Sequence, residues 1–336
     1  MHSLRRVITY ALGAAAAVHL GCGSTLPAED EPIAQDAQPS DWLWTVAHHP
    51  SDSSLLVTGG TSGTVYLLAG GCVRDSVVVG GTVTELRWHP GGQLIAIAVQ
   101  DGVSAIADVR TGALLPLAGL HEFGARAVGW DPSGERLAVG DYAGDLSLYD
   151  TAGGLLERIH LPQKAIIGLD WRPDGRSVAT VGDDLVLYDP ASGRIRVVPD
   201  RDEDVLMLSV AFHPSGGLLA TGDYGDQEHG RQPLLQLWDT SGVRIRVITD
   251  AAAEYRSLEW SRDGKLLAAV CDELRISTRG GELAGRRTVA GGALLWGVSW
   301  AADGGQVAVT DERGGLHVVS ADLSASRRIG LQSCHD

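Results

Sequence analysis

The chain has 336 residues, of which 44% are hydrophobic and 21% are charged, and it contains 44 glycines. This composition excludes a disordered chain and is typical of a well-packed body with many tight turns. The formal net charge of −15 disfavours nucleic-acid binding, because a strongly negative field repels phosphate backbones.

The first 21 residues have the three parts of a secretory signal. Arg5 and Arg6 supply positive charge, residues 7–20 are apolar, and small residues follow them. An apolar stretch of about 14 residues is shorter than the ~20 that a permanent membrane-spanning helix needs. We therefore expect a signal peptide over residues 1–21 and export of the mature chain.

Residues 19–24 resemble the bacterial lipoprotein cleavage box, in which a cysteine follows a small residue and becomes lipidated. The resemblance implies lipidation of Cys22 and an outer-membrane lipoprotein that faces the periplasm or the surface. His19 departs from the aliphatic residue that this family prefers there. Residues 22–41 are rich in Pro, Asp and Glu, and we expect a flexible acidic tether. A periplasmic or secreted protein without a lipid is the alternative.

One phrase recurs seven times after this tether: an aromatic residue or histidine, a Pro or Asp-Gly turn in most copies, and a short apolar run. Successive copies are 40 to 48 residues apart, counted from His48, Trp88, Trp130, Trp171, Phe212, Trp260 and Trp300. A unit of this length cannot bury an apolar face alone, so neighbouring units must stack and the array must close. The repeat therefore predicts one domain over residues 42–333.

The third unit shows the expected strands most clearly. Residues 127–130, 137–140, 145–150 and 155–160 are apolar or alternating, and turn residues separate them. No segment beyond the signal has a convincing helical period. The sequence thus predicts an all-β, seven-bladed β-propeller of four-stranded antiparallel blades.

The unit resembles that of the WD-repeat family, whose third strand ends in Trp-Asp or a related pair. Trp238-Asp239 matches this pair, and Tyr149-Asp150 and Tyr188-Asp189 are variants of it. The family's Gly-His dipeptide is missing, so the buried network of that family is expected to be incomplete. Residues 107–112 are similar to a segment of quinone-dependent dehydrogenase propellers, but the docking tryptophan is absent from residues 114–117.

No catalytic motif stands out, since the nucleophile-elbow, zinc-protease and phosphate-loop patterns are absent. His48, His89 and His213 are interpreted as turn residues in equivalent slots, one blade or more apart and too distant to share a metal. We expect no enzyme activity, no cofactor and a monomer. The alternative is a propeller hydrolase or lyase with polar groups that converge in the central channel.

Aspartates recur at or near the turn between the second and third strands of six units: Asp101, Asp141, Asp183, Asp223, Asp272 and Asp311. Such side chains often accept hydrogen bonds from their own turn amides. The functional alternative is an acidic rim that attracts a cation or a basic partner protein.

The fifth unit is enlarged by seven residues within the segment 224–233, close to the carboxylates of residues 200–204. An insertion in an even array usually falls on one face, often the binding face, although it can simply be tolerated. Val205 stands where a calcium loop needs glycine, so we expect no metal here. The sequence predicts a partner-binding sector at Asp200, Asp202, Asp204, Asp223, Tyr224, Asp226, Glu228, His229 and Arg231.

Three cysteines remain after Cys22. Cys72 begins the last strand of the first unit, and Cys334 lies just beyond the last strand of the seventh. Closure of the ring would make these units neighbours, so Cys72 and Cys334 could form a disulfide. The alternative is that both remain unpaired thiols. Cys271 lies in an apolar run, and we expect it to be buried.

Overall fold

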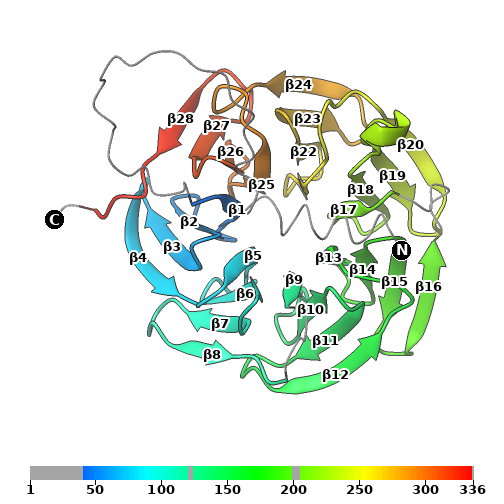
Figure 1. Cartoon of the computed structure of the whole chain (residues 1–336), viewed down its shortest axis with the longest axis horizontal. Helices are drawn as coiled ribbons and strands as arrows, with labels where there is room; N and C mark the ends of the chain where they lie inside the picture. The colour runs from blue at the N-terminus through cyan, green and yellow to red at the C-terminus, as the bar shows by residue number, and fades with distance from the viewer. Residues whose placement is uncertain (1–40, 120–123, 199–204, 335–336) are drawn as a thin grey trace, which may run out of the picture. The chain divides into compact units, whose positions relative to one another are not determined.

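The computed structural model describes residues 41–119, 124–198 and 205–334. Seven four-stranded antiparallel sheets follow one another around a ring, and each sheet, or blade, uses four consecutive strands. The first strand of each blade lies nearest the centre and the fourth lies outside (Figure 1). The prediction of an all-β seven-bladed propeller is confirmed.

Blade 1 contains β1 (Leu43–His48), β2 (Leu55–Gly60), β3 (Thr64–Ala69) and β4 (Cys72–Val78). Blade 2 contains β5 (Thr82–Trp88), β6 (Leu94–Gln100), β7 (Ala105–Asp108) and β8 (Leu114–Pro116). Blade 3 contains β9 (Ala125–Trp130), β10 (Leu137–Asp141), β11 (Asp145–Tyr149) and β12 (Leu155–His160). Blade 4 contains β13 (Gly168–Trp171), β14 (Val178–Val181), β15 (Leu185–Asp189) and β16 (Arg194–Val198).

Blade 5 contains β17 (Met207–Phe212), β18 (Leu218–Asp223), β19 (Leu235–Asp239) and β20 (Arg244–Ile248), with the short 3₁₀ helix η1 (Gln227–His229) between β18 and β19. Blade 6 contains β21 (Ser257–Trp260), β22 (Leu266–Val270), β23 (Leu274–Thr278) and β24 (Leu283–Arg287). Blade 7 contains β25 (Leu295–Trp300), β26 (Gln306–Asp311), β27 (Leu316–Ser320) and β28 (Ser326–Ile329).

The hydrophobic core lies between the blades. Among the described residues, seven clusters of buried apolar side chains each join two neighbouring blades, such as Val57 of blade 1 with Ile97 of blade 2. The second strands are the most enclosed, and every residue of β10 is buried. A strand with neighbours on both sheet faces needs apolar residues at successive positions, which explains the apolar run of each repeat.

The connections between antiparallel strands divide between two faces of the ring. The turn face carries the turns between the first and second strands, namely residues 49–54, 89–93, 131–136, 172–177, 213–217, 261–265 and 301–305. The loop face carries the turns between the second and third strands, namely residues 61–63, 101–104, 142–144, 182–184, 224–234, 271–273 and 312–315. Hydrogen bonds such as that from Leu161 N to Gly144 O (2.9 Å) place the connections between blades on the loop face too.

On the turn face, one contact recurs from blade to blade. The Nε2 atoms of His49 and His89 donate to Gly92 O and Gly134 O, both at 3.0 Å, in the next blade. His213 makes the same bond to Gly264 O at 2.8 Å. The imidazoles lie where a side chain on these glycines would stand, and Gly92 has a φ of 71°, so only glycine fits.

These contacts correct the sequence interpretation of one histidine. His49, and not His48, shares the slot of His89 and His213. His48 occupies the position that tryptophan holds in most other blades, and burial lowers its pKa to about 4. Its Nδ1 lies 3.1 Å from Ser299 O of blade 7.

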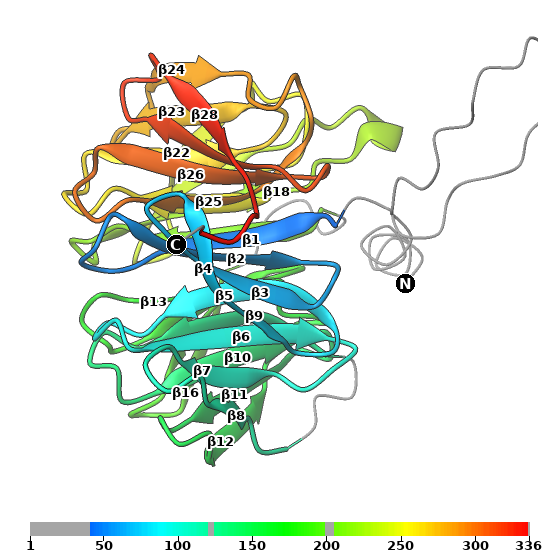
Figure 2. The same cartoon turned by 90° about the vertical axis from the view of Figure 1, so that its left-hand side faces the viewer.

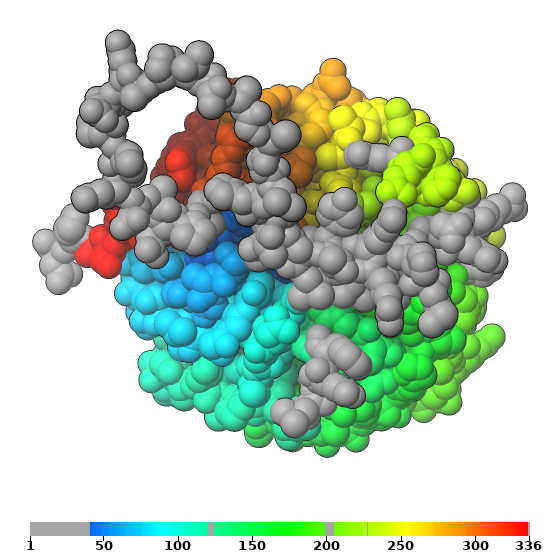
Figure 3. Space-filling view, viewed as in Figure 1, coloured from blue at the N-terminus to red at the C-terminus, as the bar shows by residue number. Residues whose placement is uncertain are grey.

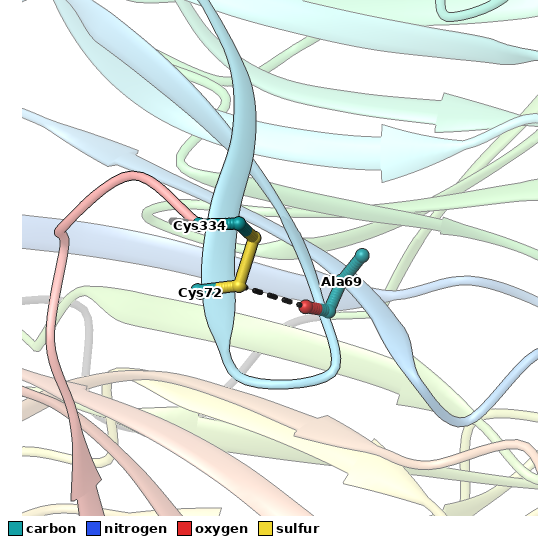
Figure 4. Close-up of a disulfide and its surroundings, with 3 residues drawn as sticks. All are labelled: Ala69, Cys72 and Cys334. Carbon is teal, nitrogen blue, oxygen red and sulfur yellow. Dashed lines mark hydrogen bonds between the residues drawn. A yellow bond between two sulfur atoms is a disulfide. The ribbon is translucent and has the colours of Figure 1, made fainter. Parts of the chain in front are cut away.

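The ring closes where blade 7 meets blade 1. His48 N donates to Ser299 Oγ at 2.9 Å at the centre, and the segment after β28 pairs with β4 at the outside. A disulfide joins Cys72 to Cys334, with 5.2 Å between the Cα atoms (Figure 4). Blade 7 takes all four of its described strands, β25 to β28, from residues 295–329. Cys271 is buried and unpaired.

Candidate functional site

The enlarged loop of blade 5, residues 224–234, differs from every other turn of the loop face by its length. In blade 3, Asp141 Oδ1 accepts hydrogen bonds from the amides of Ala143 and Asp145, two and four positions later. In blade 5, Asp223 Oδ1 accepts from Gly225 N at 3.0 Å and from Leu234 N at 2.7 Å. The two bonds are therefore kept, and the insertion lies between them.

The interior of this loop is held by its own hydrogen bonds. Asp226 and Arg231 exchange two backbone bonds, of 2.9 and 2.7 Å. His229 Nδ1 lies 2.5 Å from Asp226 Oδ2. Burial would raise the pKa of the Asp226 carboxyl, but the hydrogen bonds from His229 outweigh it and lower the pKa. Internal hydrogen bonds thus give the loop a defined conformation.

The tip of the loop exposes polar side chains. Glu228, His229 and Arg231 are exposed, and Tyr224 is half-buried. The loop projects beyond the neighbouring turns (Figure 2) and forms the yellow-green surface of blade 5 in the space-filling view (Figure 3). A hollow of about 450 Å³ lies beside it, between Arg231 and Thr249.

The predicted sector is placed only in part. Asp223, Tyr224, Asp226, Glu228, His229 and Arg231 all belong to the loop or its base. Asp223 is 2% exposed, so it shapes the loop and is not available for direct contact with a partner. Asp200, Asp202 and Asp204 lie outside the described residues, as does Cys22.

Three of the six recurring aspartates of the loop face, Asp141, Asp223 and Asp311, accept hydrogen bonds from their own turns, whereas Asp183 and Asp272 accept from Lys164 N and Ala252 N in the connections between blades. Asp141 and Asp311 are 3% and 2% exposed. Asp311 Oδ1 accepts from Arg313 N and Gly315 N, and its Oδ2 lies 2.8 Å from His317 Nε2. Asp101, by contrast, is exposed. The carboxylates of blades 3, 5 and 7 are therefore structural.

A group of charged residues that was not predicted from the sequence lies at the centre of the ring. Arg87 pairs with Glu85 at 2.7 Å on β5, and it also interacts with Asp170 on β13 and Glu259 on β21. Blades 2, 4 and 6 are not adjacent, so these charges act on one another across the centre of the ring. Burial raises the pKa of Asp170 to about 6 and that of Glu259 to about 7.

A signal for this group was present in the repeat. Arg87, Asp170 and Glu259 each stand immediately before the recurring aromatic residue, at a position where the third unit has Gly129. A charged residue beside a buried aromatic in a first strand is unusual. The position four residues before the recurring aromatic residue or histidine is also unusual in several units. It holds the arginines and tryptophans that are described below.

The described residues hold no group of His, Cys, Asp or Glu arranged to bind a metal ion. Within the same residues, no helix has the length and apolar character to cross a membrane.

One family comparison gave a match. Residues 65–121, which begin in β3 and include blade 2, match the family described as the anaphase-promoting complex subunit 4 WD40 domain. No curated protein matches the chain. The match and the seven blades together support a WD-repeat β-propeller. In blade 5, Trp238 Nε1 donates a hydrogen bond to Thr221 Oγ1 at 2.9 Å.

Proposed function

We propose that the protein is a non-catalytic scaffold of the bacterial cell envelope that binds another protein through the enlarged loop of blade 5. The propeller and the WD40-domain match support an interaction scaffold in general. The specific proposal depends on one observation: a single blade carries an ordered, exposed insertion, while its two capping bonds match those of a short turn.

Charge indicates the kind of partner. The chain carries a formal charge of −15, and Glu228 and Asp101 are exposed on the loop face. Complementary charge speeds encounter and suppresses wrong partners. We therefore propose a partner with a basic surface, which the acidic residues of this face attract.

Deletion of residues 226–232 tests the role of the loop. The deletion places Leu234 four positions after Asp223, which is the spacing that blade 3 has, so the blade is expected to fold. In cells, crosslinking followed by mass spectrometry of envelope proteins should identify a partner of the intact chain. With the purified partner, the deletion should weaken the dissociation constant at least about tenfold, which corresponds to about 1.4 kcal/mol.

The control is Arg176→Ala, an exposed change on the turn face, which should leave partner binding unchanged. Equal binding of the intact and deleted chains would reject the role of the loop.

Export and lipid anchoring belong to the same proposal. The support is the sequence of residues 1–24 together with the Cys72–Cys334 disulfide, since structural disulfides are typical of oxidising compartments. The mass of the N-terminal peptide from cells tests it. A lipidated Cys22 is expected, and an intact Met1 or an unmodified Cys22 would contradict the anchor.

A second candidate function, a propeller hydrolase or lyase, is favoured by the central charges alone. The pKa of Glu259, at about 7, suits a general acid or base near neutral pH. A panel of ester, glycoside and uronate substrates tests this function. Any activity found should fall at least about a hundredfold in Glu259→Gln, as expected for the loss of an acid–base group.

A further inference from the structure

Four side chains from different blades form a continuous stack near the centre of the loop face, here called the arginine–tryptophan column. The Cζ atom of Arg256 lies 3.9 Å from the ring centroid of Trp296. Trp296 stacks on Trp44, with 4.9 Å between centroids and 12° between planes. The Cζ atom of Arg126 lies 5.7 Å from the centroid of Trp44.

Irregularities in the first strands place three of these residues, whereas Arg256 lies just before β21. The register of β1 shifts between Leu43 and Thr45, so Trp44 is an extra residue, and the pairing of β9 likewise skips Arg126. The pairing of β25 shifts between Leu295 and Val298, a stretch that includes Trp296. A β-bulge redirects a side chain out of the regular alternation, which is why such bulges are common beside binding sites.

The column contains donors without acceptors. Trp44 and Trp296 are 7% and 8% exposed, and their buried indole Nε1 atoms have no hydrogen-bond partner among the described residues. Indole and guanidinium groups donate hydrogen bonds and cannot accept them. Of the five tryptophans in the turn-face repeat, Trp88, Trp171, Trp260 and Trp300 donate to a carbonyl of the preceding blade, whereas the indole of Trp130 also has no partner among the described residues.

The two nearby carboxylates both act on Arg256, and neither forms an ion pair with Arg126. Glu254 pairs with Arg256 at 3.3 Å, and Glu312 interacts with Arg256 while it accepts a bond from Leu294 N. Within the described residues, Arg126 has no carboxylate at ion-pair distance, and its Nη1 donates to Thr84 O at 3.3 Å. Burial lowers the pKa of Arg256 despite Glu254, so an additional anion would stabilise its charge.

We propose that the arginine–tryptophan column binds a carboxylate group of a ligand that approaches from the loop face. A carboxylate offers two acceptor oxygens in the plane that a guanidinium fork matches. Arg126 and Arg256 are half-buried, so a ligand can reach them. The site goes beyond the proposed function and does not depend on the loop of blade 5.

The carboxylate can come from a small acid or from an acidic side chain of a polypeptide. Calorimetry on the full chain, with tryptophan fluorescence as a second readout, should compare glutarate with acetyl-Ala-Glu-Ala-amide. The neutral probe acetyl-Ala-Gln-Ala-amide is the matched control. Binding of glutarate alone assigns a small acid, and tighter binding of the Glu peptide assigns a polypeptide.

Arg126→Gln is the decisive variant, because Arg126 has no ion pair with a described residue whose loss would disturb the fold. It should weaken the dissociation constant of the preferred probe at least about tenfold, the effect of one charge-assisted hydrogen bond. Trp296→Phe keeps an aromatic ring but changes the surface on which Arg256 packs, and it should weaken binding by a smaller factor. Arg246→Gln, on the outer strand of blade 5, is the arginine control and should not change binding.

Three results would overturn the site: no binding of either acid at about 10 mM, equal binding of the Glu and Gln probes, or equal binding by Arg126→Gln and the unmodified chain. Deletion of residues 226–232 should leave carboxylate binding intact, so failure of the loop proposal and failure of the column can be told apart.

Discussion

The two faces of the ring follow different rules. On the turn face, blade after blade repeats one contact, in which a histidine or Arg172 reaches a turn glycine of the next blade. On the loop face, blade 5 alone carries the enlarged loop. Near the centre of the same face, the arginine–tryptophan column combines two arginines and two tryptophans from four blades.

The difference separates residues that build the ring from residues that are free to differ. This contact occurs at four of the seven junctions, and there the turn-face residues are constrained by their neighbours. A loop-face residue that appears in one blade only has no such constraint. We therefore regard the unrepeated loop face as the place for function, and three predictions test the comparison.

The largest effect is expected at the junction of blades 7 and 1, where the two ends of the repeated array meet. The double variant Cys72→Ser/Cys334→Ser should lower the free energy of unfolding by about 5 kcal/mol. The reason is that the bridge joins residues 262 positions apart and so restricts the unfolded chain strongly. Denaturant unfolding measures it. Cys271→Ala, which leaves the bridge intact, is the control, and a loss below about 1 kcal/mol in the double variant would contradict the prediction.

A smaller effect is expected within the turn-face repeat itself. Trp88 and Trp130 both meet a histidine edge-on, at 4.8 and 4.9 Å, but only Trp88 has an indole bond, to Ala47 O at 3.0 Å. Trp88→Phe should therefore cost about 1 kcal/mol more than Trp130→Phe.

Urea unfolding of the two tryptophan variants gives the difference directly, since each serves as the control for the other. Equal losses of unfolding free energy would mean that the packing of the aromatic ring, and not the indole hydrogen bond, stabilises the contact between blades.

The smallest effect is expected from the centre of the ring. The pKa of Glu259 rises from 4.5 to about 7 and that of Asp170 from 3.8 to about 6, so the folded state holds protons that the unfolded chain has released. The free energy of unfolding should therefore increase as the pH falls from about 8 to about 6. This gain should be lost when the pH is raised again. His48, lowered from 6.5 to about 4, opposes this gain below pH 6.5.

Melting temperature against pH measures the gain, which should be about 2–4 °C in the unmodified chain. Glu259→Gln should flatten the curve above pH 6.5, where His48 contributes little. Parallel curves for the two proteins would show that Glu259 does not titrate in this range.

Prediction from sequence worked where contacts are local or repeated. The four predicted strands of the third unit correspond to β9, β10, β11 and β12 within two residues at each end. It failed at His48, because the doubled His48-His49 allowed two alignments of one repeat and only the bond from His49 to Gly92 distinguishes them. It could not evaluate Asp223, because an exposed and a capping aspartate look alike in sequence.

The sequence by itself determined the blade number and the strand quartets, because each unit of about 40 residues must present the same apolar and turn residues to its neighbours. Only the tertiary structure decided what meets at the centre. Arg87 and Glu259 are far apart along the chain, as are Trp44 and Trp296, and no periodic pattern in the sequence shows that the first pair interacts electrostatically or that the second pair stacks. Closure of the ring brings them together, because it converts separation in sequence into proximity around one axis.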